Sequence, residues 1–140
     1  MQADDTALFL SLRPRYAELL LSGRKSVELR RVQPAAPAGS IVLLYASSPA
    51  MTLVGRAEVS EIQVASLENI WRQHGPKTGI TRDEYDHYFA GLDQAVAILL
   101  ANIRRLDRPR SLSDLRHRLE GFRPPQSYRY LSGGQVAELI

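Results

Sequence analysis

The stretch Gly23-Arg-Lys-Ser-Val-Glu-Leu-Arg30 joins two elements of the chain and carries an unusual set of charges. A glycine that follows an apolar, helix-like segment is typical of a helix end. From Lys25 to Arg31 apolar and polar residues alternate, which predicts a half-buried strand. One face of this strand carries Val27 and Leu29, and the other carries Ser26, Glu28 and Arg30. The sequence therefore predicts a helix-to-strand corner with lysine, glutamate and arginine close together.

Lys25 stands out because 16 of the 18 basic residues are arginine. A lysine supplies a compact ammonium group that can lose its proton, which arginine cannot do. The functional interpretation is therefore that Lys25, Glu28 and Arg30 line a cleft. The alternative is a solvated lysine beside a surface ion pair worth well under 1 kcal/mol, with Gly23 as a simple helix cap. Spacing alone favours the second interpretation.

The rest of the chain reads as short elements separated by Pro and Gly. Strands are expected at Leu8–Leu12, at Ile41–Ala46 in a central position, at Leu53–Ile62 with a bend near Gly55, and at Ala95–Leu106. Helices are expected from Pro14 to Gly23, over Leu67–His74 after Ser66, over Arg82–Ala90 with a Thr81/Glu84 capping box, over Ser111–Leu119, and over Gln135–Ile140. This pattern predicts an α+β domain around a small twisted or barrel-like sheet.

Length and composition restrict the class of protein. A chain of 140 residues is expected to form one domain, residues 1–140, and 44% hydrophobic with 24% charged residues is typical of a soluble globular protein. The longest apolar runs are too short to span a membrane. Acidic residues near the N-terminus do not resemble a leader peptide, so we expect a cytoplasmic protein. Without cysteine, disulfides and thiolate chemistry are excluded.

Charge is distributed unevenly along the chain. Residues 13–31 carry six basic and two acidic side chains, residues 58–93 carry three and seven, and residues 104–130 carry eight and three. Two basic segments around an acidic middle can fold into one basic face, which is the electrostatic footprint of a polyanion-binding protein. A solvated arginine surface would give the same count, so both interpretations stay open.

Two kinds of site are not supported by the sequence. The histidines His74, His87 and His117 lie far apart and form no metal-ligand motif. Gly133-Gly134 is an isolated pair rather than a phosphate-binding loop. We therefore expect no metal and no cofactor.

Ser11-Leu-Arg-Pro-Arg-Tyr16, followed by Gly23-x-Lys25-x-x-Glu28-x-Arg30, resembles the ASCH domain, a branch of the PUA-like superfamily. The resemblance is densest over residues 8–31. It implies a small β-barrel of about five to six strands with peripheral short helices and a cleft beside the Gly-x-Lys-x-x-Glu-x-Arg segment. It also implies nucleic-acid binding, chiefly of RNA, and in some members catalysis on RNA or on a modified nucleoside.

The chain shows two departures, one from the family pattern and one from a catalytic branch of the family. Arg13 stands where many members have lysine, which keeps the charge and changes its geometry. The branch that resembles acetylcytidine amidohydrolases uses a lysine, a threonine three residues later and a distant glutamate. Here Glu28 replaces the threonine, and Thr78 falls near the position of the distant glutamate. Two of that branch's catalytic residues are therefore unmatched.

The segment Phe122-Arg-Pro-Pro-Gln-Ser-Tyr-Arg-Tyr-Leu131 offers a second candidate surface. Its arginines, polar groups and tyrosines on an extended Pro-Pro scaffold are typical of single-stranded RNA binding. The alternative is that Phe122, Tyr128 and Leu131 anchor the segment to the sheet. For Trp71 and for the cluster Tyr85, Tyr88 and Phe89 we expect core packing rather than base stacking.

Three functions remain, in this order. The first is an RNA-binding module that contacts RNA, a nucleotide or a nucleoside through Arg13, Tyr16, Arg24, Lys25, Arg30, Arg123, Tyr128 and Arg129. The second is an enzyme, either a metal-independent ribonuclease or a hydrolase of a modified nucleoside, with Lys25, Glu28, Tyr45 and Ser127 as candidate catalytic residues. The third is a protein-interaction or ligand-sensing domain that uses the acidic helices between residues 66 and 90.

Overall fold

The structure, a computed structural model, describes residues 6–140. Met1–Asp5, on which the expectation of no leader rests, lie outside the described residues. The strands are β1 (Thr6–Leu12), β2 (Val27–Arg30), β3 (Ile41–Ala46), β4 (Thr52–Ser66), β5 (Gln94–Ser111) and β6 (Tyr128–Ser132). The helices are α1 (Pro14–Leu21), α2 (Leu67–His74), α3 (Arg82–Tyr88), α4 (Leu112–Arg118) and α5 (Gly133–Leu139), with a 3₁₀ turn at Gly75–Lys77.

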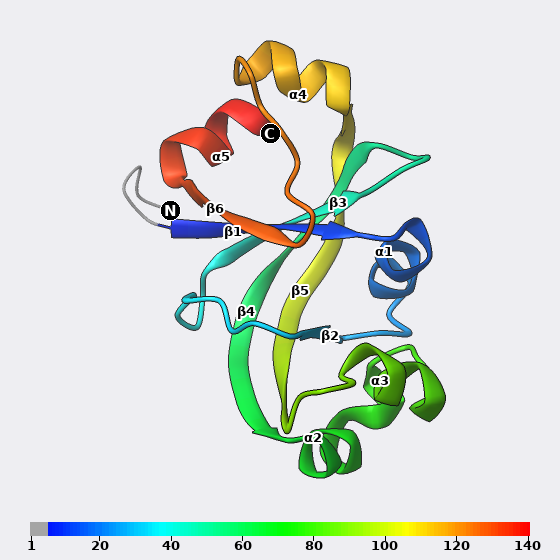
Figure 1. The fold of residues 1–140 in the computed structure, drawn as a ribbon. Helices are drawn as coiled ribbons and strands as arrows, with labels where there is room; N and C mark the ends of the chain where they lie inside the picture. Colours follow the sequence, from blue (N-terminus) through cyan, green and yellow to red (C-terminus); the bar gives the residue numbers. More distant parts are fainter. Residues whose placement is uncertain (1–5) are drawn as a thin grey trace.

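The strands form one mixed sheet in the order β2-β5-β4-β3-β1-β6. β1 and β3 are parallel, and the other neighbours are antiparallel. The long strands β4 and β5 pair from Thr52↔Ser111 to Ser66↔Gln94 and run at a steep angle to β1 and β6 (Figure 1). Register shifts along this pair increase its twist and bend the ribbon. The expectation of a long, bent strand around Gly55 is confirmed.

The sheet is curled but not closed into the barrel that the sequence predicted. β2 and β6 remain its edges, and no backbone ladder joins them in residues 6–140. Across this gap the side chain of Arg30 donates hydrogen bonds to the carbonyl oxygen of Ser11 in β1 and to Ser127 just before β6. One guanidinium group, rather than main-chain pairing, therefore connects the two edge regions. The α+β class and the strand number are as expected.

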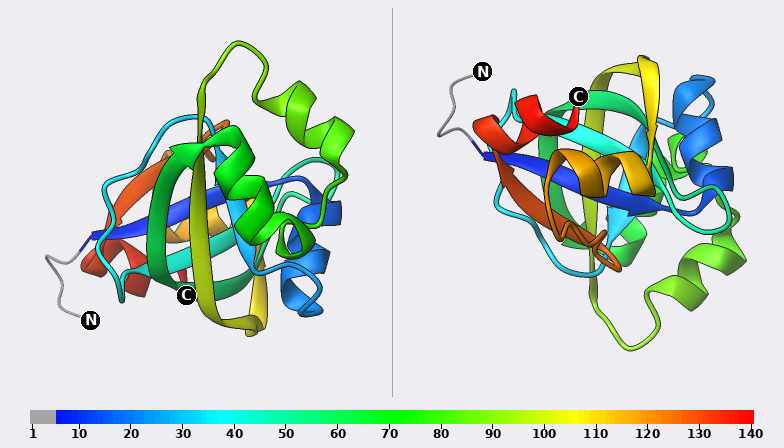
Figure 2. Two further views of the ribbon diagram at one scale, coloured as in Figure 1. Left: turned by 90° about the horizontal axis from the view of Figure 1, so that it is seen from below. Right: turned by 90° about the horizontal axis from the view of Figure 1, so that it is seen from above.

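The sheet has three buried apolar clusters, each under different helices. α1 covers the cluster around Leu10 and Leu44, α4 and α5 cover the one around Phe9 and Leu43, and α2 and α3 cover the third, around Val27. Seen from below, α2 lies across the β4–β5 ribbon, and seen from above, α4 and α5 cover its other end (Figure 2). The three clusters are thus held together by one continuous sheet.

Most local expectations are confirmed. The hydroxyl groups of Ser66, Thr81 and Ser111 cap α2, α3 and α4, and the Thr81/Glu84 capping box is present. The buried side chains of Phe122 and Leu131 anchor the C-terminal segment, whose last part forms β6 against β1. No helix within residues 6–140 has the length and apolar character needed to cross a bilayer.

One strand differs from its expected environment. β2 was expected to be half-buried, but all four of its residues are buried. The apolar side chains Val27 and Leu29 pack toward α2 and α3, while Glu28 and Arg30 are enclosed as an ion pair. A period-two pattern shows which residues share a face, but it does not show whether the polar face meets water.

Gly55 sets how closely α1 and β5 approach β4. A Cβ atom at this position would lie 2.7 Å from Leu21 Cδ2 and 2.9 Å from the carbonyl oxygen of Arg104. We expect Gly55→Ala to lower the free energy of unfolding by about 1–3 kcal/mol, because backbone as well as a side chain must move. Urea unfolding followed by tryptophan fluorescence measures this loss.

Gly134→Ala is the matched control. Its Cβ would meet Ser132 Oγ at 3.8 Å, which is ordinary van der Waals contact. An equal loss of stability in both variants would contradict the close approach inferred for Gly55.

Candidate functional site

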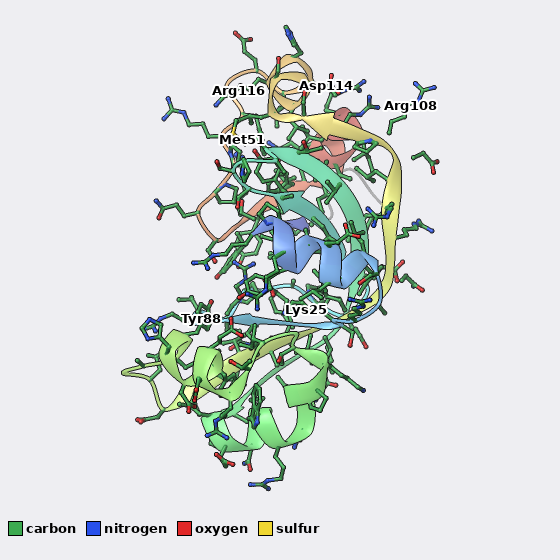
Figure 3. The ribbon with its side chains drawn as sticks, turned by 90° about the vertical axis from the view of Figure 1, so that its right-hand side faces the viewer. Lys25, Met51, Tyr88, Arg108, Asp114 and Arg116 are labelled. Carbon is green, nitrogen blue, oxygen red and sulfur yellow. The ribbon has the colours of Figure 1, made fainter. Side chains whose placement is uncertain are left out.

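A cavity of about 970 Å³ lies between α1, β2, α3 and the segment before β6. It opens beside the gap between the two edges of the curled sheet, where Arg30 reaches Ser11 and Ser127. In Figure 3, Lys25 and Tyr88 lie in the band between α1 and α3. The lining residues include Ser11, Arg13, Tyr16, Lys25, Glu28, Arg30, Arg31, Val32, Ile80, Glu84, Tyr88, Gln126, Ser127 and Tyr128. We call this cavity the cleft.

The floor of the cleft is a buried row of charges. Glu28 Oε1 lies 3.1 Å from Lys25 Nζ, and Glu28 Oε2 lies 2.5 Å from Arg30 Nη2. Lys25 also donates to the carbonyl oxygen of Thr78, at 2.5 Å. Lys25 is 2% exposed and Arg30 is 7% exposed. Glu28 therefore holds two cations that water hardly reaches, which excludes the surface-pair alternative.

Local structure explains why these three groups meet. α1 ends at Leu21, and Gly23 adopts a left-handed φ of +82° that turns the chain back. The backbone amide of Lys25 then donates to the carbonyl of Leu19, which fixes the corner. Because side chains two residues apart on a strand share a face, Glu28 and Arg30 both point into the cleft.

Electrostatics keep the central carboxylate ionised. Burial raises the pKa of Glu28, but the neighbouring charges of Arg30 and Lys25 outweigh this, so its pKa lies below the ordinary value of 4.5. At neutral pH Glu28 is therefore a carboxylate. It positions the two cations and has no proton to donate.

The donors of the two cations are used unequally. Arg30 donates to Ser11, Glu28 and Ser127, so most of its guanidinium is occupied by the protein itself. Lys25 has three donors and two oxygen contacts, to Thr78 and Glu28. Within residues 6–140, the Ser11 hydroxyl and Arg30 Nε have no hydrogen-bond partner although both are buried. Both atoms have almost no exposed surface, so the donor that remains for a ligand is the third N–H of the Lys25 ammonium.

Aromatic and apolar side chains form the walls. Tyr16 lies over the Lys25 ammonium, with its ring centre 5.4 Å from Nζ. Tyr88 is 38% exposed and its hydroxyl donates to the carbonyl of Leu29. Burial raises the pKa of Tyr88, so this phenol stays protonated at neutral pH. Val32 and Ile80 complete an apolar wall beside these rings.

Tyr88 and Ser11 line the cleft but are not among the site residues predicted from the sequence. Tyr85 and Phe89 occupy the buried face of α3, as expected, but Tyr88 lies one position before Phe89 and lines the cleft instead. The sequence did contain a signal for Tyr88: Tyr85 and Phe89 are four residues apart and share the buried face, and Tyr88 lies at the side of that face. Ser11 belongs to the quoted Ser11–Tyr16 motif, but a small hydroxyl beside an apolar strand gave no further signal.

The sequence-predicted residues fall into two groups. Arg13, Tyr16, Lys25, Glu28, Arg30, Ser127 and Tyr128 line the cleft, whereas Arg24, Tyr45, Arg123 and Arg129 do not. Arg129 lies over the Phe122 ring at 5.0 Å and donates to the carbonyl of Arg123. Tyr45 is buried in the apolar cluster with Phe9 under α4 and α5. Tyr45, a candidate catalytic residue from the sequence, therefore faces this cluster and not the cleft, because β3 turns its side chain toward α4 and α5.

The acidic helices α2 and α3 are largely neutralised. Arg82 pairs with both Glu68 and Asp86, and Arg15 pairs with Glu84. This arrangement leaves little uncompensated negative charge on the surface that the third hypothesis requires. In residues 6–140, no group of three or more His, Asp or Glu side chains is placed to hold a metal ion.

A family model described as the ASCH domain matches residues 10–110. This chain belongs to the ASCH domain family. An ASCH domain-containing ribonuclease from Zymomonas mobilis is 30% identical over 131 residues, which are 94% of this chain and 88% of the relative. The resemblance seen in the motif around Lys25 thus extends over most of the chain.

Solved structures agree with this assignment. The crystal structure of the ASCH protein from Zymomonas mobilis has a TM-score of 0.90 and 29% identity, covering 95% of this chain and 92% of that one. Human THYN1, solved in complex with 5-methylcytosine-containing DNA, has a TM-score of 0.61 at 11% identity, covering 95% and 94%. The second likeness concerns the fold alone.

Glu28→Gln tests the buried charge row of this ASCH domain. The substitution leaves Lys25 and Arg30 close together without their carboxylate, so we expect a loss of about 3–5 kcal/mol in unfolding free energy at pH 7. Because the folded-state pKa of Glu28 is lowered, its contribution is complete above pH 4.5 and is lost as pH falls through the folded-state pKa. Urea unfolding of both proteins from pH 7 downward measures the difference.

The exposed Glu120→Gln is the control and should match the wild type at each pH. If the difference in unfolding free energy between wild type and Glu28→Gln stayed constant into strong acid, the negative charge of Glu28 would not be its cause.

Proposed function

We propose that this ASCH domain binds single-stranded RNA and places one nucleotide in the cleft. The observation that carries the proposal is a buried floor with a net positive charge and one spare Lys25 donor, beneath walls of tyrosine. An anionic group can neutralise the floor, and a planar base can stack on the walls. A nucleotide has both parts in one molecule.

Charge in the cleft favours an anion. Four basic side chains, Arg13, Lys25, Arg30 and Arg31, line it against two acidic ones, Glu28 and Glu84. Arg13 is exposed at the entrance, where it can contact a phosphate without losing an internal bond. Lys25 lies deeper and keeps one donor for the ligand. A phosphate group in contact with both residues would replace water at little desolvation cost to Arg13.

Base recognition would use the walls. Tyr88 offers an exposed ring face, and Tyr16 and Tyr128 offer partly exposed rings. Stacking of a base on such a ring contributes about 1–3 kcal/mol. The exposed side chains of Gln126 and Ser127 can bond to base edges or to the ribose 2′-hydroxyl, which is the group that distinguishes RNA from DNA.

The relative from Zymomonas mobilis supports the choice of RNA. It is called an ASCH domain-containing ribonuclease, and the similarity covers 94% of this chain. A protein that acts on RNA must first bind it, so binding is the part of this relative's function that we extend to the present chain.

Lys25→Gln and Arg24→Gln form a matched pair for the test, since the two residues are neighbours and lose the same charge. Lys25 lines the cleft and Arg24 is exposed outside it. We expect Lys25→Gln to weaken binding of a labelled single-stranded RNA about tenfold or more, because a charge-assisted hydrogen bond is lost, and Arg24→Gln to stay near the wild type. Fluorescence anisotropy at several salt concentrations measures both.

Tyr88→Leu provides a second test if Lys25→Gln folds poorly. It keeps an apolar wall and removes the stacking face, so weaker RNA binding is expected here as well. Equal binding by wild type, Lys25→Gln and Tyr88→Leu would refute the cleft as the RNA site.

A ribonuclease is the second candidate function, favoured by the same relative. In metal-free cleavage the ribose 2′-oxygen forms a bond to phosphorus while the bond to the 5′-oxygen breaks, and a proton passes from the former oxygen to the latter. In this mechanism Lys25, which contacts Tyr16 and Glu28, stabilises the negative charge that develops on the phosphoryl oxygens. Ser127, whose Oγ accepts a hydrogen bond of 3.0 Å from Arg30, can orient the ribose.

Cleavage has its own test on a denaturing gel. We expect wild type to cut the RNA with EDTA present, Lys25→Gln to cut about a hundredfold more slowly, and a substrate with 2′-deoxyribose at the cut site to remain intact. RNA that is bound but never cut would be consistent with the binding function and would refute the ribonuclease function. Cleavage of the 2′-deoxy substrate would refute this chemistry.

A further inference from the structure

A second hollow, of about 550 Å³, lies beside the C-terminal half of β5, next to Arg56 of β4 and the C-terminal Ile140. Figure 3 shows Arg108 beside β5, well away from Lys25 and Tyr88. The lining residues are Arg56, Arg104, Arg105, Leu106, Asp107, Arg108, Arg110 and Ile140. Five of these eight residues are arginine and one is acidic. We call this hollow the arginine groove.

An irregularity in the strand pairing builds the groove. Leu53 pairs with Arg110 and Gly55 pairs with Arg105, so residues 106–109 of β5 face Val54 alone. This is a large bulge, and Pro109 lies in it, where a missing backbone amide breaks no ladder bond. The bulge displaces Arg108 from the regular alternation of the strand. A bulge of this kind commonly re-aims side chains toward a ligand.

The charge arrangement is unfavourable without an anion. Arg56 and Arg104 occupy directly paired positions on adjacent antiparallel strands, where like charges destabilise a sheet. Within residues 6–140, Arg56, Arg104 and Arg108 have no acidic side chain in ion-pair contact. The protein therefore keeps three neighbouring cations that it does not neutralise.

The other two arginines of the groove are positioned by the protein. Arg105 pairs with Glu18 of α1 at 2.6 Å. Arg110 lies 3.5 Å from Asp114 and donates to the carbonyl of Ile140, yet its buried Nε has no partner within the described residues. These contacts hold the bulge against α1 and α4.

The groove and the cleft lie on two sides of α1. Arg13 and Tyr16, at the start of this helix, line the cleft, and Glu18 contacts the groove residue Arg105. Helix α1, whose diameter is roughly 10–12 Å, therefore lies between residues of the two sites. A chain of nucleotides that leaves the cleft can pass around α1 to the groove, whereas a single nucleotide cannot reach both.

We propose that the arginine groove binds backbone phosphates of the same RNA strand whose nucleotide occupies the cleft. This inference rests on the proposed function and deepens it, because it makes the ligand a polymer rather than a free nucleotide. Planar guanidinium groups suit phosphate oxygens in two-point contacts, and the groove offers no aromatic ring for a base. The groove adds affinity without sequence preference.

The experiment compares Arg104→Gln/Arg108→Gln with the control Arg72→Gln/Lys77→Gln. Both double variants lose two positive charges at exposed positions, and Arg72 and Lys77 belong to neither site. The ligands are a labelled dinucleotide, which can fill the cleft alone, and a single-stranded RNA of about 12 nucleotides, within the span of small nucleic-acid-binding domains. Anisotropy titrations at several salt concentrations give the affinity and its salt slope.

We expect the groove variant to bind the longer RNA about tenfold more weakly and to show a salt slope smaller by about 1.4, since each lost phosphate contact removes about 0.7. Its affinity for the dinucleotide should equal that of the wild type, and the control variant should bind both ligands with wild-type affinity. Two results overturn phosphate binding by the groove and leave the proposal for the cleft standing. One is that wild type binds the dinucleotide as tightly as the longer RNA, and the other is that both double variants lose equal affinity for the longer RNA. Absence of any RNA binding by the wild type overturns the proposed function and the groove together. Binding of poly-glutamate by the groove as tightly as RNA overturns its assignment to a nucleic acid.

Discussion

The carboxylate of Glu28 holds Lys25 and Arg30 at the almost fully buried floor of the cleft, and three features depend on it. It allows two cations to be buried side by side, which would otherwise carry a large free-energy cost. It orients Arg30 toward Ser11 and Ser127, so that the two edges of the sheet are joined without a backbone ladder. It also directs Lys25 into the cleft with a donor to spare. One ion pair thus contributes to the shape of the sheet and to the chemistry of the site.

The open sheet and the cleft are consequences of the same geometry. A closed barrel would satisfy the edges of β2 and β6 with main-chain hydrogen bonds and fill the interior with side chains. Here a side chain connects those edges, and the space beside it is lined by polar groups from both. The long β4–β5 ribbon supplies the curvature that brings the edges near each other, and its bulge supplies the arginine groove. Both proposed binding sites therefore lie at the irregular parts of the sheet.

Local signals predicted much of this structure. The capping residues Ser66 and Thr81 marked helix starts correctly, because a cap acts on the next three residues and needs no distant contact. The Lys25–Glu28–Arg30 grouping followed from strand periodicity and from the family motif. The burial of β2, the open edge and the position of Tyr45 were not predictable in this way, since each depends on which strands become neighbours. Tyr88 was missed for the same reason: its exposure depends on where α3 packs.

The bond from Arg30 to Ser127 joins residues that are 97 positions apart in the chain. During synthesis the N-terminal part of a protein leaves the ribosome first and can begin to fold before the rest exists. In this protein the residues of α1 and of the corner at Gly23 are made early, but β2 can pair only after its one sheet neighbour, β5, has been made. Ser127, Tyr128 and the strand β6 beside β1 are made later still. The cleft is therefore incomplete until nearly the whole described chain has been made. A nascent chain presents basic side chains near the ribosome without the pocket that would give them selectivity, so the RNA binding proposed for the cleft requires the finished molecule.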